Sequence, residues 1–227
     1  MTADETDLTG LLVAAGVDAA VAARLAAYGA LLLEANRKVN LTGAKDPAAL
    51  TPHLLDALTL AGEVRESLID VGSGGGLPGI PLALATGVPV TLLEPIAKKA
   101  AFLRGALEAL GIAGTVVAGR AENAARDPAL REQFAYATAR AVSNPSTVAE
   151  LTVPFLRVGG RALLQRAKLE PAERHALEDA APMLGAVLLE ERAAGEGRWI
   201  VVLEKRLPTA QRFPRRNGIP EKRPLCR

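Results

Sequence analysis

A glycine-rich segment between an apolar run and a proline-containing helix start most strongly constrains the fold of this 227-residue chain. The apolar run 68–71 contains Asp70, and glycines follow at positions 72, 74, 75 and 76. Glycine adopts positive φ without steric cost and lets a ligand touch bare backbone. Pro78 and Pro81 fit the first turn of a following helix, where a missing N–H costs little. A strand, a glycine turn and a helix N-terminus in this order predict a nucleotide-type cofactor site on an α/β sheet.

The residues around this loop favour a cofactor that has no phosphate groups. The dinucleotide fingerprint requires glycine at the sixth position of the loop, where this chain has Leu77. Asp70 would repel a pyrophosphate and suits a cationic ligand. Glu94 ends the next apolar run, 22 residues after Gly72, where a carboxylate can accept from both ribose hydroxyls. S-adenosylmethionine has a ribose, a sulfonium and an α-ammonium group, so Asp70, Gly72, Gly74 and Glu94 predict it as the cofactor.

Three other interpretations of the loop stay open at this point. In the first, the loop is only a tight turn between a strand and a helix, which is disfavoured because an acid, Glu94, recurs at the distance expected for a cofactor site. An NAD-dependent oxidoreductase is disfavoured by Leu77 and by the absence of a Tyr-x-x-x-Lys pair in the sequence. An RNA-binding protein with a vestigial cofactor fold is disfavoured by the intact glycines and acids, and a cofactor titration distinguishes it from an enzyme.

Alternating strand and helix patterns predict the fold class and the domain organisation. Strands are predicted at 67–71, 89–93, 114–118, 135–140 and 161–166, and helices at about 78–86, 96–110, 121–132, 145–157 and 171–183, with helix stops at Gly111 and Gly159-Gly160. Two final runs, 186–190 and 199–204, are joined by a hairpin-like linker. The pattern predicts an α/β fold, a Rossmann-like doubly wound sheet with its last strand antiparallel, which is the class I methyltransferase architecture. We expect a helical N-terminal extension (1–62) with helices at about 18–38 and 47–61, a methyltransferase domain (63–207) and a basic tail (208–227).

Charge is distributed unevenly along the chain. Residues 205–227 hold eight Lys or Arg residues and one acid, so this end has a net charge of +7 and the remainder −5. This asymmetry predicts a polyanionic partner for the tail, with Arg215 and Arg216 among its contacts. The alternatives are that the tail is a disordered, solvated end, or that it packs back on the sheet as a structural belt. The absence of a leader, of an 18-residue apolar span and of any cysteine but Cys226 predicts a soluble cytoplasmic protein with no membrane partner.

A series of short motifs in a fixed order adds a family resemblance, which covers the chain from about residue 25 to its end. The motifs are Asn40-Leu41-Thr42, Asp46-Pro47, 53–58, 70–81, 98–103, 119–122, 139–141 and 213–225. In this order they resemble the RsmG (GidB) family of small-subunit rRNA guanine-N7 methyltransferases. The resemblance implies S-adenosylmethionine-dependent methylation of N7 on guanine 527, in the 530 loop of 16S rRNA. The implied partner is 16S rRNA or a small ribosomal subunit precursor, met by a monomeric enzyme that needs no metal.

The resemblance also implies roles for individual residues. Gly72 and Leu77 match loop positions that contact the cofactor, and Ala121 and Glu122 match the pair beside the adenine. Arg140 matches a basic residue next to the methyl-transfer site, which makes it the predicted catalytic residue and a cofactor contact. The positions suspected of handling RNA are Asn40, Arg120 and Arg198. This chain departs from many relatives in Glu94, where they carry aspartate, and in Ser73, where they carry threonine.

The absence of other catalytic patterns agrees with N7 chemistry. Cys226 lies near the end of the tail, unlike the core nucleophile of a pyrimidine C5 methyltransferase. The segment 138–142 lacks the Asn/Asp-Pro-Pro-aromatic loop of exocyclic-amine methyltransferases. Guanine N7 has a free lone pair, so alignment suffices and no general base is predicted. His53 is expected to pack in an amphipathic helix.

Overall fold

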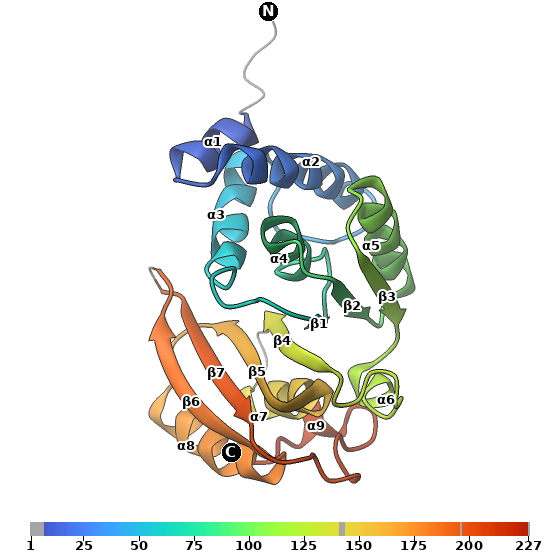
Figure 1. The fold of residues 1–227 in the computed structure, drawn as a ribbon, viewed down its shortest axis with the longest axis vertical. Coiled ribbons are helices and arrows are strands. Elements are labelled where there is room, and N and C mark those ends of the chain that lie inside the picture. Colours follow the sequence, from blue (N-terminus) through green and yellow to red (C-terminus); the bar gives the residue numbers. More distant parts are fainter. Residues whose placement is uncertain (1–6, 141–143, 196, 227) are drawn as a thin grey trace, which may run out of the picture.

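The computed structural model describes residues 7–140, 144–195 and 197–226, which fold around a seven-stranded β-sheet (Figure 1). Its strands are β1 (Leu68–Val71), β2 (Val90–Glu94), β3 (Gly114–Ala118), β4 (Phe134–Arg140), β5 (Leu156–Arg166), β6 (Ala186–Ala193) and β7 (Trp199–Lys205). Their order in the sheet is β3-β2-β1-β4-β5-β7-β6. Strands β1 to β5 are parallel, and β7 is antiparallel to both β5 and β6. The predicted doubly wound sheet with an antiparallel last strand is confirmed.

The strand order reverses at β1, and this reversal fixes where a ligand can bind. The chain moves outward from β1 to β2 and β3, and then returns to the other side of β1 to form β4 and β5. Connections that follow β1 and β4 therefore leave in opposite directions. In open parallel sheets, ligands bind in the crevice that this divergence leaves at the carboxyl ends of the strands.

Two helical layers cover the sheet (Figure 1). The first contains α1 (Leu8–Ala14), α2 (Ala19–Asn36), α3 (Pro47–Leu58), α4 (Gly79–Thr86) and α5 (Ala97–Ala109), and the second contains α6 (Ala121–Ala124), α7 (Pro145–Thr152), the 3-10 helix Val153–Phe155, α8 (Pro171–Met183) and α9 (Ile219–Lys222). Successive strand residues point to opposite faces, so Leu92 packs in the first core and Leu93 in the second. Within the described ranges, no helix is long and apolar enough to cross a membrane.

The N-terminal helices pack directly on the glycine loop. As predicted, Asp46 caps α3 by accepting from the Ala49 N–H (2.8 Å), with Pro47 in the first turn. The buried Tyr28 hydroxyl donates to the Gly75 carbonyl (2.7 Å). A Cβ at Gly75 would lie 3.0 Å from the Leu41 carbonyl oxygen, so only glycine allows this close approach. The N-terminal extension therefore contacts the glycine loop directly and supports it.

Two predicted boundaries are wrong for local reasons. The helix predicted over 121–132 ends at Ala124, because Pro128 disfavours helical geometry at Asp127, whose side chain caps a turn by accepting from the Ala129 N–H (2.9 Å). Gly159-Gly160 does not end a helix but lies inside β5, with φ +84° at Gly159. The register of β4 and β5 shifts there, which is the signature of a bulge.

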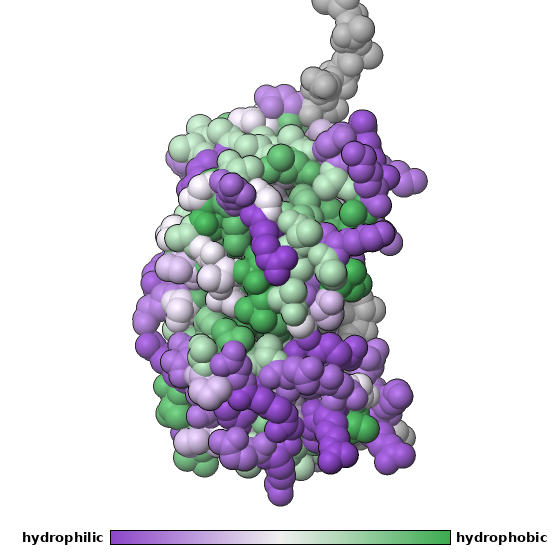
Figure 2. Space-filling view, turned by 90° about the vertical axis from the view of Figure 1, so that its right-hand side faces the viewer, coloured by the Kyte–Doolittle hydropathy of each residue, from purple (hydrophilic) through white to green (hydrophobic). Residues whose placement is uncertain are grey.

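The C-terminal tail (208–226) packs against the second helical layer through a few buried residues, while many of its polar residues are exposed. Phe213 is buried, and its carbonyl oxygen accepts from Nη1 of Arg131 (2.9 Å). The Thr147 hydroxyl of α7 donates to the Pro220 carbonyl (2.8 Å). Hydrophilic residues cover this lower end of the molecule in Figure 2, while apolar residues gather above, over α2 and α5. The structure thus supports the belt alternative for the tail.

Candidate active site

The loop after β1 is fixed to the end of β2 by backbone hydrogen bonds. The N–H groups of Gly72 and Ser73 both donate to the Leu93 carbonyl, at 2.9 and 3.1 Å. Gly72, Gly74 and Gly76 have φ values of +76°, +57° and +99°, which residues with a side chain rarely adopt. The glycine spacing of the sequence is therefore required by the backbone path of the loop.

Asp70 supports the loop from below. Its side chain accepts from the Gly79 N–H and from the Thr138 hydroxyl, both at 3.2 Å, and the residue is only 1% exposed. Burial raises the pKa of Asp70 to about 6, although these two hydrogen bonds and the Ser73 hydroxyl favour the ionised form. The carboxylate is thus used to hold the start of α4. The predicted contact of Asp70 with a cationic ligand stays a prediction, because these two hydrogen bonds do not test it.

Glu94 joins the loop to the segment after β2. It is buried, and its Oε2 accepts from the Gly74 N–H and its Oε1 from the Ile96 N–H, both at 2.9 Å. Each carboxylate oxygen has a second lone pair that can accept a further hydrogen bond, so ribose binding by Glu94 stays a prediction consistent with this geometry. Leu77 is buried beside the loop, and its predicted contact with the cofactor also stays untested.

A cavity of about 240 Å³ opens at the carboxyl edge, where the strand order reverses. It brings together five of the predicted site residues, Gly72, Arg120, Ala121, Glu122 and Arg140. Asp70, Gly74, Leu77, Glu94, Asn40, Arg198, Arg215 and Arg216 do not line it. The rest of its lining is Val71, Leu93, Pro95, Gly119, Ala139, Val148, Leu151 and Thr152.

The Glu122 carboxylate is the acidic group of this cavity. Its Oε1 accepts from the Gly218 N–H of the tail at 2.8 Å and from Nη2 of Arg120 at 3.4 Å. Burial acts to raise the pKa of Glu122, but the N–H groups of Gly218 and of Glu122 itself, together with Arg120, hold it below its usual range. Glu122 is therefore an anion that its surroundings fix in one orientation.

Arg140 is the last residue of β4 and lines the same cavity. Among the described residues it forms no hydrogen bond or ion pair, and the residues 141–143 that follow it lie outside the described ranges. Burial, and then the positive charges of Arg140 and Arg198, lower the pKa of His53, so this imidazole is neutral at pH 7. Arg198 donates to the Pro52 carbonyl (3.0 Å) and lies 3.9 Å from Asp56. The charges of Arg140 and Arg198 thus both act on His53 of α3.

The predicted RNA contacts lie in different surroundings. Asn40 is exposed, in a turn that Asn36 holds by accepting from the N–H groups of residues 41 and 42. Arg216 is exposed, but Arg215 is paired with the buried carboxylate of Glu150. Arg215 thus has a structural partner in the core, which the charge count of the tail does not reveal.

Sequence reasoning missed two parts of this site. Val148, Leu151 and Thr152 of α7 line the cavity, and an ordinary apolar helix pattern carries no signal of that role. Gly218 reaches Glu122 from 96 positions away in the sequence. The glycine within the ordered tail motif was the one available signal for it.

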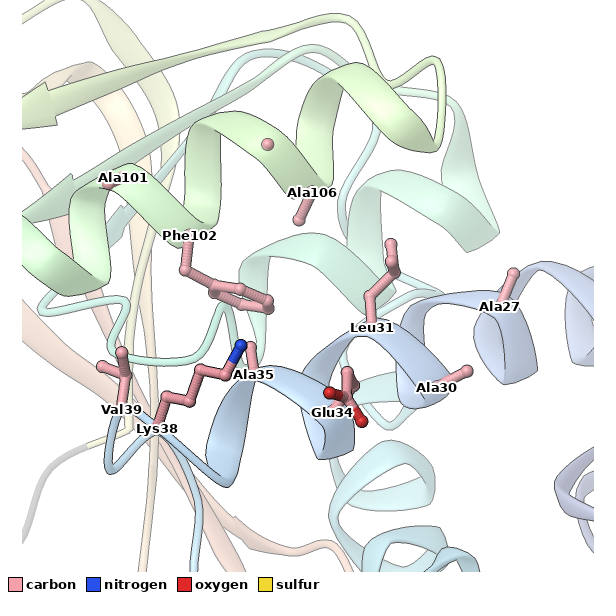
Figure 3. Close-up of a pocket in the computed structure, with 11 residues that line it drawn as sticks. Ala27, Ala30, Leu31, Glu34, Ala35, Lys38, Val39, Ala101, Phe102 and Ala106 are labelled. Carbon is pink, nitrogen blue, oxygen red and sulfur yellow. The ribbon is translucent and has the colours of Figure 1, made fainter.

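A larger cavity of about 650 Å³ lies between α2 and α5 (Figure 3). Phe102 and Leu31 project from the two helices toward it, and Lys38 lies at its edge. Its lining is mostly alanine and other apolar side chains, and it contains no predicted site residue. Binding sites combine apolar walls with several convergent polar groups, so the smaller cavity is the better candidate.

The residues of the smaller cavity fit a nucleoside cofactor. A Cβ at Gly72 would meet no atom within 4 Å, so the loop leaves open space where it faces the cavity. The apolar wall suits an adenine ring, and Glu122 suits its hydrogen-bonding groups. The strand order, the glycine loop, the acid at the end of β2 and this cavity define a class I S-adenosylmethionine-dependent methyltransferase.

Comparisons with known proteins identify the family. The family model GidB, described as rRNA small subunit methyltransferase G, matches residues 22–201, and the chain belongs to this family. A relative from Rubrobacter xylanophilus named ribosomal RNA small subunit methyltransferase G is 43% identical over 86% of this chain and 81% of its own. A relative of the same name from Deinococcus deserti is 37% identical over 92% of this chain and 91% of its own. The predicted family membership and cofactor class are confirmed.

Solved structures show the same fold at low identity. A methyltransferase described as S-adenosyl-L-methionine-dependent from Methanococcus maripaludis superposes with a TM-score of 0.57, at 13% identity, over 79% of this chain and 92% of its own. A geranyl diphosphate methyltransferase in complex with sinefungin gives a TM-score of 0.55, at 15% identity, over 71% of this chain and 80% of its own. At this identity the likeness shows the fold alone.

Proposed function

We propose that this protein transfers a methyl group from S-adenosylmethionine to N7 of guanine 527 in the 530 loop of 16S rRNA. The observation that carries the proposal is the gathering of Gly72, Ala121, Glu122 and Arg140 around one cavity in a chain of this family. The relatives are named for small-subunit rRNA and match nearly the whole chain. We propose that the enzyme acts in the cytoplasm, as a monomer, on RNA in a ribonucleoprotein context.

For this reaction the protein must align the methyl group of the cofactor with guanine N7, and it does not need to transfer a proton. S-adenosylmethionine supplies an electrophilic methyl group on a sulfonium sulfur. Guanine N7 offers a lone pair and no proton, so no side chain needs to act as a base. Holding the two reactants in line lowers the barrier by roughly 7–11 kcal/mol. The glycine loop, Ala121 and Glu122 are proposed to hold the cofactor, and the apolar residues of α7 to exclude water.

Arg140 is proposed to orient the target nucleotide. It lies at the carboxyl end of β4, at the edge of the cofactor cavity, and partly exposed. A guanidinium at this place donates hydrogen bonds to a phosphate or to the base edge. Asn40, Arg120 and Arg198 are proposed to contact the RNA around it. The exposed Arg216 is a proposed phosphate contact of the tail, and RNA contact by Arg215, whose guanidinium is paired with Glu150, stays a prediction.

Mapping of the methylated guanine tests this function. Ribosomal RNA from a strain that lacks the gene is compared by mass spectrometry with RNA from strains that carry the wild-type gene or Arg140→Ala. We expect guanine 527 to lose its N7 methyl group without the gene and to regain it only with the wild-type protein. A methyl group on N1 or N2, or on another nucleotide, contradicts the proposal.

A further inference from the structure

One hydrogen bond joins the C-terminal tail to Glu122, a residue that lines the cavity. The Gly218 N–H donates to Oε1 of Glu122 at 2.8 Å, and Glu122 lines the cavity with a side chain that is 4% exposed. The second donor to this oxygen, Arg120, lies 3.4 Å away on a side chain that is 47% exposed. Gly218 is thus the closer and better shielded partner of the two.

Gly218 is itself held in place on both sides. On one side, Arg215 forms an ion pair of 2.7 Å with Glu150, which is fully buried in α7. On the other side, the Thr147 hydroxyl of α7 donates to the Pro220 carbonyl at 2.8 Å. The tail therefore carries Gly218 as a fixed donor attached to α7, a helix that also lines the cavity.

The backbone conformation at Gly218 requires glycine. Its φ and ψ are +73° and −4°, in the left-handed region, and they aim its N–H at Glu122. Helix α6, which carries Glu122, has only four residues and restrains the carboxylate little by itself. The orientation of Glu122 thus depends on a donor from the far end of the sequence.

We propose that the C-terminal tail is part of the cofactor site and that Gly218 is a positioning residue, which orients the Glu122 carboxylate for S-adenosylmethionine. This inference rests on the proposed function, because it takes Glu122 as a cofactor contact. Cofactor binding then depends on the tail in a way that is separate from any contact of the tail with RNA.

Calorimetric titration of the full-length protein with S-adenosylmethionine tests the proposal. A Cβ at Gly218 would meet no atom within 4 Å, so Gly218→Ala disturbs the backbone and not the packing. Gly87 has nearly the same φ and ψ, +74° and +2°, also with open space, at the end of α4 away from the loop, so Gly87→Ala is a matched control for backbone strain. We expect Gly218→Ala to weaken cofactor binding about tenfold, the scale of a hydrogen bond to a charged group, and Gly87→Ala to leave it unchanged.

A double-mutant cycle separates positioning from general stability. In a Glu122→Ala background, Gly218→Ala is expected to cost no further affinity, because the group that it positions is gone. An equal loss with and without Glu122, or equal affinities for Gly218→Ala and Gly87→Ala, overturns the inference. Wild-type affinity in Glu122→Ala overturns it too and removes Glu122 from the proposed cofactor contacts, but leaves the proposed methyl transfer to guanine 527 standing. No binding by the wild-type protein overturns both.

A milder variant keeps the test valid if Gly218→Ala folds poorly. Thr147→Val removes only the hydroxyl that holds Pro220 and changes no residue of the cavity lining. We expect a severalfold loss of cofactor affinity that again disappears in the Glu122→Ala background. A loss that persists there shows that the tail acts through general stability and contradicts the proposal.

Discussion

Arg215 and Glu150 form the ion pair that fastens the tail to the body of the protein. Glu150 is fully buried, and it accepts from the Arg215 backbone N–H (2.7 Å), from Nε (3.0 Å) and from Nη2 (2.7 Å). The Arg215 side chain is 26% exposed, so water screens part of the interaction. The pair satisfies a carboxylate that the core of the protein would otherwise leave unpaired.

Loss of Arg215 is expected to destabilise the fold. Arg215→Ala leaves the buried Glu150 without its charge partner and is expected to cost about 2–3 kcal/mol, less than a fully buried pair because of the partial exposure. In a protein of this size, that is a fall in Tm of roughly 5–10 °C. Arg216→Ala removes the same charge from an exposed neighbour and is the control, with an unchanged Tm. Equal melting temperatures for the two variants would show that the pair contributes nothing.

The two arginines are also expected to differ toward RNA. Each phosphate contact that is lost lowers the slope of log affinity against log salt by about 0.7 to 0.9. Arg216→Ala is expected to remove one phosphate contact and therefore to reduce this slope by about 0.7 to 0.9, without changing the affinity for S-adenosylmethionine. If filter binding at several salt concentrations gives an unaltered slope, Arg216 does not contact an RNA phosphate.

The glycine loop is expected to tolerate no side chain at Gly74. Gly74→Val places a branched side chain at φ +57° in a loop that the cofactor is proposed to touch. Gly111 has φ +59° and open space at the end of α5, so Gly111→Val is subject to the same backbone strain, on the order of 1–3 kcal/mol, away from the site. We expect both variants to lose similar stability and only Gly74→Val to lose S-adenosylmethionine binding in calorimetry. Retained affinity in Gly74→Val would exclude this part of the loop from the site.

Arg140 is expected to act on turnover more than on cofactor binding. Arg140→Ala should lower the rate of methyl transfer to small-subunit RNA roughly 100-fold, the scale for removing one positioned donor, with a much smaller change in cofactor affinity. Single-turnover kinetics alongside calorimetry measure the two effects separately. A parallel collapse of both would make Arg140 a cofactor-binding residue first.

The buried Asp70 is expected to make stability depend on pH. Its pKa is about 6 in the folded protein and 3.8 as an unperturbed carboxyl, so the folded state binds the proton more tightly. Wild-type stability should therefore fall, relative to Asp70→Asn, as pH rises from about 4 to 7, by roughly 3 kcal/mol in total. Urea unfolding of both proteins across this range measures the difference. A constant difference would mean that Asp70 has an ordinary pKa in the fold.

Local patterns in the sequence determined the fold class and the cofactor class. The loop glycines, the cap at Asp46 and the alternation of strands and helices depend on backbone preferences within a few residues, which a sequence shows directly. The ordered motifs indicated the family by resemblance, which the comparisons confirm. The short α6 and the bulge at Gly159 were missed because Pro128 and the β4–β5 register decide them.

Only the tertiary structure decided how charges and donors far apart in the sequence are used. The charge of the tail indicated a polyanion partner, but packing pairs Arg215 with Glu150, 65 positions away, and brings Gly218 to Glu122. Asp70 is the acid predicted to face the ligand, and the parallel register also places it beside Thr138, whose hydroxyl donates to its carboxylate. The physical reason is that a side chain's partner depends on long-range packing, and burial then decides whether its charge meets a ligand or holds the fold together.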